Sequence, residues 1–173
     1  MTSKLKVDEI APRTVDRITG IKLYDVSQWR VTTDFTGDAT PIATNLEEVD
    51  APVGFGKLGS SMSESSGIFS FPAVGMWWVE FTVYATNANY KEQVLYISTT
   101  TNNSTYATAA YGAQIKAQSA GSGVANISTL FDVTDTAQCK CKFNVTQEGA
   151  TVTTRGDTAV NETYMTFMRL GDT

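Results

Sequence analysis

The chain has 173 residues, which is long enough to bury a hydrophobic core without help from a disulfide or a metal ion. Its 13 basic residues are scattered and its net charge is −5, which argues against nucleic acid and against an acidic membrane surface as partners. No apolar run approaches the ~20 residues of a membrane span. Charged residues make up only 18% of the chain, and its many Thr, Ser, Asn and Gly residues favour strands over long solvated helices.

The first segment, residues 1–23, differs from the rest of the chain. Pro12 and Gly20 interrupt it, its charges nearly cancel, and its apolar residues fit no helical stripe. We therefore predict an extended N-terminal arm, with a disordered tail as the alternative. Charges of both signs flank Leu5, Val7 and Ile10, a pattern that suits strand addition to the sheet edge of a partner.

The remainder of the chain, residues 24–173, reads as strands separated by turn residues, and no segment shows helical periodicity. Residues 37–50 are predicted as a loop, and residues 59–66 as a Ser-rich turn. At least eight strands of this kind indicate a sandwich or a barrel. The predicted strands cover residues 24–36, 53–58, 67–72, a segment that starts at Gly75, and then 93–100, 106–118, 124–133, 137–147 and 163–170.

The clearest predicted strand starts at Gly75. One of its faces is uniformly apolar and should face the core, with Trp77, Val79, Phe81 and Val83. The other face mixes aromatic side chains with a carboxylate and consists of Met76, Trp78, Glu80, Thr82 and Tyr84. Exposed Trp78 and Tyr84 would form an unusual apolar patch unless another subunit covers them.

The two cysteines, Cys139 and Cys141, lie on one face of the predicted strand 137–147, together with Ala137. A disulfide between positions i and i+2 of a strand would be badly strained. The chain has no His to complete a zinc site with them. We predict two reduced cysteines that pack as small buried side chains, without a metal.

No catalytic constellation stands out, and we predict that the protein is not an enzyme and needs no cofactor. The absence of His removes Ser-His-Asp and Cys-His catalysis as usually built. Glu47 and Glu48 could be offered as a carboxylate pair for glycoside cleavage, but a solvated acidic edge is the favoured interpretation. Asp132 and Asp135 could bind Ca²⁺, but turn formation is favoured.

Three tyrosines could stack on sugar rings, although ordinary strand packing is the favoured interpretation. They are Tyr90, Tyr106 and Tyr111.

Ser66–Val83 leads through Gly75 into an aromatic-rich strand, and residues 163–171 form an aromatic strand that ends the domain. These two segments resemble the tumour-necrosis-factor and complement-globular-head superfamily, whose domains are compact jelly rolls that assemble as trimers. The resemblance implies an all-β jelly-roll β-sandwich over residues 24–173, and a homotrimer in which the strand from Gly75 lines the three-fold axis. The trimer interface would include Trp78, Glu80, Thr82, Tyr84 and Tyr164.

Five further segments carry a closer resemblance: residues 4–10, 29–35, 62–72, 130–136 and 169–173. They resemble segments of small virion proteins of marine tailed bacteriophages. This resemblance implies a homotrimeric capsid decoration (cement) or head-fibre protein, made in the bacterial cytoplasm and placed on the capsid surface. Its arm would dock on the major capsid protein through Leu5, Val7, Ile10, Val15 and Ile18.

The alternative function is a tail-fibre tip or receptor-binding module that recognises a glycan or a protein on the host surface. A tail fibre usually needs a long shaft, and only residues 1–23 precede the predicted domain. This favours the capsid. Fold alone does not decide between the two, because jelly rolls serve in all of these positions.

Overall fold

The computed structural model describes residues 24–87, 92–115, 121–147 and 152–173. The predicted arm and Tyr90 lie outside these residues. All the regular elements of the described residues are β-strands. The prediction of an all-β domain is confirmed.

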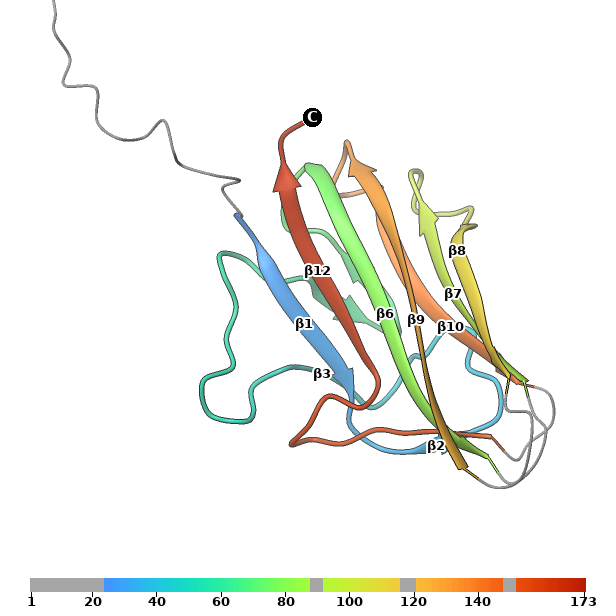
Figure 1. Cartoon of the computed structure of the whole chain (residues 1–173). Coiled ribbons are helices and arrows are strands. Elements are labelled where there is room, and N and C mark those ends of the chain that lie inside the picture. The colour runs from blue at the N-terminus through green and yellow to red at the C-terminus, as the bar shows by residue number, and fades with distance from the viewer. Residues whose placement is uncertain (1–23, 88–91, 116–120, 148–151) are drawn as a thin grey trace, which may run out of the picture.

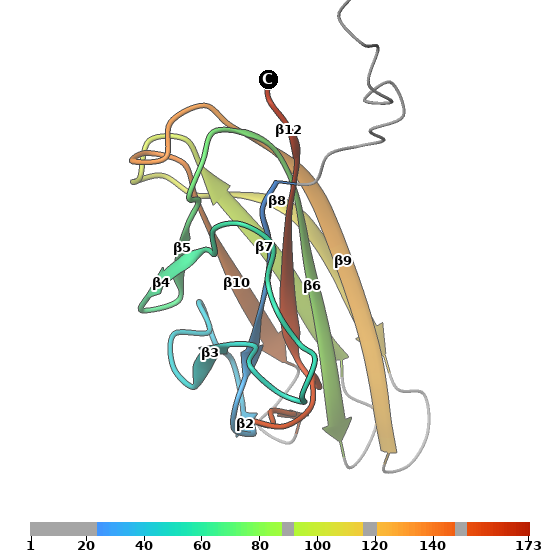
Figure 2. The same cartoon turned by 90° about the vertical axis from the view of Figure 1, so that its left-hand side faces the viewer.

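Two antiparallel sheets pack face to face (Figures 1 and 2). The seven-stranded sheet has the order β2-β11-β6-β12-β1-β3, and β9 pairs along the other edge of β6. Its strands are β1 (Val26–Val31), β2 (Phe35–Thr36), β3 (Leu46–Glu48), β6 (Gly75–Asn87), β9 (Gly121–Val133), β11 (Thr153–Thr154) and β12 (Tyr164–Gly171). The five-stranded sheet has the order β4-β5-β10-β7-β8. Its strands are β4 (Ser63–Ser65), β5 (Ile68–Ser70), β7 (Glu92–Thr100), β8 (Ala107–Ile115) and β10 (Lys140–Gln147).

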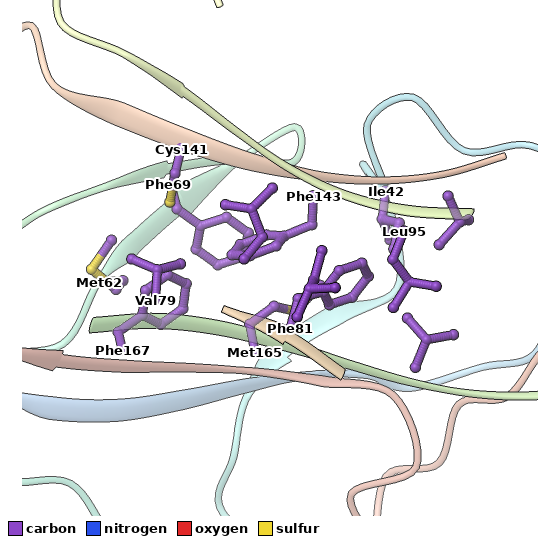
Figure 3. Packing of buried hydrophobic residues seen from close by; sticks show 14 of the residues in the cluster. Ile42, Met62, Phe69, Val79, Phe81, Leu95, Cys141, Phe143, Met165 and Phe167 are labelled. Carbon is purple, nitrogen blue, oxygen red and sulfur yellow. The ribbon is translucent and has the colours of Figure 1, made fainter. Parts of the chain in front are cut away.

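The core lies between the two sheets and is rich in aromatic rings (Figure 3). Phe69 of β5 is at its centre, with ring centroids 5.5 Å from Trp29, 5.4 Å from Phe143 and 5.2 Å from Phe167. Such edge-to-face and tilted pairs add to the stabilisation that burial provides. The predicted inward face of β6 is confirmed, because all four of its apolar side chains are buried: Trp77, Val79, Phe81 and Val83.

The edges of the two sheets meet on one side of the sandwich, where β8 approaches β9. Gly112 of β8 lies so close that a Cβ atom there would come within 2.7 Å of Cγ2 of Ile127. Only glycine leaves room for this approach. The position explains why the small-residue run of β8 contains a glycine on its inward side.

The predicted strand over residues 53–58 is wrong. These residues form an exposed loop, in which the amide of Phe55 donates to the carbonyl of Pro52, and only Leu58 forms an isolated bridge, to Val26. Gly54 takes a φ of 98°, which closes the turn. Apolar residues recur in this segment as they do in a strand, but the glycines between them favour a turn over an extended strand.

Short strands were missed where the sequence is polar. β3 lies in the predicted loop 37–50, β4 lies in the predicted turn 59–66, and β11 has only two residues. β3 and β4 are edge strands, which need no apolar alternation, and β11 is too short to show a period.

Ala137 was predicted to face the core with the cysteines, but its side chain is exposed. Its backbone amide donates to the carboxylate of Asp135 at 2.8 Å, which places Ala137 in a turn. The strand β10 begins only at Lys140.

Candidate assembly face of the seven-stranded sheet

The five residues predicted at the trimer interface lie on one face of the seven-stranded sheet, the face away from the core. Trp78, Glu80, Thr82 and Tyr84 alternate with the buried residues of β6, and Tyr164 of β12 lies opposite Thr82. Figure 1 shows β6 flanked by β12 on one side and β9 on the other. We call this surface the assembly face.

An apolar row crosses the assembly face at the level of Trp78. The register of the strands aligns Leu130, Trp78, Met168, Val26 and Leu58. Leu130 is 56% exposed and Leu58 is 48% exposed, and the other three side chains are half-buried. The sequence prediction included only Trp78 from this row, since its partners follow from strand register.

The next row of the assembly face is polar and consists of Ser128, Glu80, Thr166 and Gln28. Glu80 accepts a 2.7 Å hydrogen bond from the side-chain amide of Asn126, which also donates to Thr82 at 2.7 Å. The amide of Gln28 donates to the Thr166 hydroxyl at 3.0 Å. A carboxylate with a donor in its own subunit loses less on burial than an unpartnered one.

A hollow lies beyond the polar row, and its walls are largely aromatic and apolar. It is lined by Thr82, Tyr84, Val124, Asn161, Glu162 and Tyr164. Val124 is 65% exposed and lies opposite Tyr84 on the neighbouring strand. The assembly face therefore has apolar surface on both sides of a hydrogen-bonded polar row.

Both cysteines are buried and free, as predicted. Burial raises the pKa of the Cys141 thiol far above its usual range. A thiol with a raised pKa carries almost no thiolate near neutral pH, and thiolate is the reactive form. This makes Cys141 a packing residue and a poor nucleophile.

We expect both cysteines to be inert in the folded protein. A thiol reagent at pH 8 should modify Cys139 and Cys141 only after urea is added. Replacing both with Ala should preserve the fold and lower the free energy of unfolding by ~1–3 kcal/mol from lost packing. Stoichiometric zinc, measured by elemental analysis of protein purified without chelators, would contradict this expectation.

The acidic residues considered in the sequence have structural partners. Glu47 forms a 2.7 Å ion pair with Arg30, and Glu48 pairs with Lys57 at 3.2 Å. Asp135 closes the turn before β10, as predicted. Within the described ranges no group of three or more His, Cys, Asp or Glu side chains is placed to hold a metal ion.

Both tyrosines that the structure describes have packing partners, as the favoured interpretation predicted. Tyr106 is half-buried, and the Lys142 ammonium lies 4.4 Å from its ring centroid. Tyr111 stacks on Tyr96 of the neighbouring strand but is 73% exposed, so packing covers only part of its ring.

Within the part of the chain that the structure describes, no helix is long and apolar enough to cross a membrane.

Together, the strand order and the two packed sheets define a jelly roll of the tumour-necrosis-factor type, so the predicted fold class is confirmed. Murine APRIL, in its crystal structure at pH 5.0, is similar with a TM-score of 0.61 and 10% identity over 86% of this chain and 100% of that one. Eiger TNF from S. frugiperda has a TM-score of 0.58 and 10% identity over 87% of this chain and 94% of that one. No protein-family model and no curated protein matches the sequence. At this identity the likeness is one of fold.

Proposed function

We propose that this chain is a non-enzymatic structural protein of a tailed-bacteriophage virion. It assembles as a homotrimer through the assembly face and serves as a capsid decoration or head-fibre protein. The observation that carries the assembly is the apolar row, whose side chains the described residues leave exposed or half-buried. The virion setting depends on the resemblance of the sequence to phage virion proteins.

The energetics of the assembly face favour self-association. Contiguous apolar patches on monomers usually mark interaction sites, and each Å² of apolar area removed from water contributes about 25 cal/mol. The hydrogen bonds from Asn126 to Glu80 and from Gln28 to Thr166 reduce the cost of burying the polar row. Closed rotational symmetry then covers the face of every subunit at once, and a three-fold axis is what the resemblance to trimeric jelly rolls implies.

A structural role is also supported by the chemistry that the described residues offer. The free thiol of Cys141 is held protonated by burial. The acidic pair of β3 is engaged with Arg30 and Lys57. Neither group has the neighbours that nucleophilic or general acid-base catalysis requires.

The position of the chain entry supports a docking role for the arm. Tyr24 precedes β1 at the end of the sandwich where β12 finishes, and the amide of Arg169 donates to the carbonyl of Asp25 at 2.8 Å. An arm that leaves the domain at this end can bind a partner there, with the opposite end of the domain directed away from that partner. The residues proposed to dock on the major capsid protein are Leu5, Val7, Ile10, Val15 and Ile18.

Deleting Met1 to Gly20 should leave a folded trimer that no longer joins the virion. Residues 24–173 form the two packed sheets and the core between them, so we expect sedimentation and melting temperature to match the full chain. Capsid occupancy, measured by gel densitometry or by a map of purified particles, should fall to background. Normal occupancy would assign docking to the jelly roll, and loss of folding would show that the arm belongs to the core.

A further inference from the structure

We propose that the outer face of the five-stranded sheet carries a binding site for neutral sugar rings, centred on Tyr96 and Tyr111. This inference goes beyond the structural role proposed above and does not depend on it. The site lies on β7 and β8, on the opposite side of the sandwich from the assembly face.

The two rings form a platform that is unusual for a strand surface. Tyr96 and Tyr111 lie directly opposite each other on neighbouring strands, with ring centroids 6.3 Å apart and an interplanar angle of 27°. Tyr111 is 73% exposed, the largest fraction for any aromatic side chain among the described residues. A well-exposed ring held by a near-parallel neighbour offers a stable flat surface at low entropic cost.

The neighbouring residues leave space beside the rings. A depression of about 520 Å³ is lined by Glu92, Val94, Tyr96, Thr108, Tyr111 and Ala113. On β8 the residues around Tyr111 are small, namely Ala107, Thr108, Ala109, Ala110, Gly112 and Ala113. The Tyr111 ring therefore projects beyond its small neighbours, and its face is accessible to a ligand.

A β-bulge brings a hydroxyl group to the site. Ile97 pairs with Ala110, but the next residue, Ser98, pairs with Thr108, so Ala109 is an extra residue on β8. Bulges of this kind redirect side chains and recur next to functional sites. Here the bulge allows Thr108 to line the same depression as Tyr111, although the two are three residues apart.

The chemistry of the lining fits a neutral sugar. The apolar C–H face of a pyranose packs on a tyrosine ring, whose face is electron-rich. The carboxylate of Glu92 accepts hydrogen bonds from sugar hydroxyls, and the Thr108 hydroxyl can donate or accept. Glu92 is the single charged residue of the described lining, and the chain carries −5 overall. Sialylated, sulfated and phosphorylated ligands are therefore disfavoured.

The test is a glycan array of neutral hexose and N-acetylhexosamine oligosaccharides, with sialylated and sulfated glycans printed beside them. The full-length protein should bind at least one neutral glycan and none of the anionic ones. Tyr111→Ala should weaken that binding by about tenfold or more, whereas Tyr111→Phe should stay within about threefold, because the ring is retained. Glu92→Gln should weaken binding without abolishing it.

Phe55→Ala is the matched control, since Phe55 is also an exposed aromatic residue but lies in the distant loop 51–58. It should bind the glycan as the unsubstituted protein does. Equal melting temperatures for all variants will separate a lost site from a lost fold. The proposal is overturned if no neutral glycan is retained, if only the sialylated or sulfated glycans bind, or if Tyr111→Ala binds unchanged.

Discussion

Replacing Trp78 with Asp should convert the trimer to a monomer. Trp78 lies in the middle of the apolar row, between Leu130 and Met168 on the neighbouring strands. The substitution removes a large apolar contact and places a charge where the interface excludes water, which costs several kcal/mol per subunit. In sedimentation at micromolar concentration, the mass should fall from three times 18.7 kDa to 18.7 kDa.

The matched control is Tyr111→Asp, which introduces the same charge on the opposite side of the sandwich. That variant should remain trimeric, because β8 presents Tyr111 to solvent and not to the assembly face. A monomeric unsubstituted protein at micromolar concentration would refute the proposed homotrimer. A trimeric Trp78→Asp variant would move the interface to another surface.

The second large effect is expected at Arg30, whose guanidinium is completely buried. It forms ion pairs with Glu47 at 2.7 Å and Asp50 at 2.9 Å, and donates to the carbonyl of Ala51 at 3.0 Å. All three partners lie in β3 or just after it. Arg30 thus fixes this part of the chain to β1.

Arg30→Ala should lower the free energy of unfolding by ~3–5 kcal/mol, because it leaves a cavity and deprives Glu47 of its counter-charge. Urea denaturation with an unchanged m-value would measure this loss. The double variant Arg30→Met with Glu47→Leu should recover much of it, since no unpaired charge is then left. Lys57→Ala breaks the more exposed pair with Glu48 and should cost less than about 1 kcal/mol. Equal losses for Arg30→Ala and Lys57→Ala would contradict this account.

The sequence predicted features that depend on local periodicity. A strand alternates its side chains between two faces, so the sides of Trp77 and Trp78 could be assigned from sequence alone. The apolar row could not, because Leu130, Met168 and Val26 reach Trp78 only through the register of three long-range strand pairs. Register depends on packing and turn geometry, which no short window of sequence contains.

The errors have related causes. Val53 and Phe55 alternate like strand residues, yet neither pairs with a strand of the described ranges, and only Leu58 of this segment forms a bridge. The local sequence pattern correctly placed Tyr111 on a strand. Its exposure could not be predicted in this way, because it results from small neighbours and from the position of β8 as the last strand of its sheet. Both are tertiary properties.

The close approach of β8 and β9 also affects the resistance of the domain to aggregation when many copies lie close together. Unpaired edge strands invite pairing with other chains, and long flat ones are the most dangerous. Here the two longest edge strands face each other, with Gly112 packed against Ile127. On the side away from the β8–β9 junction, the seven-stranded sheet ends in β3 and the five-stranded sheet ends in β4. Each of these two strands has three residues. Such short edges are poor templates for strand addition, so the folded domain should remain soluble at high local concentration.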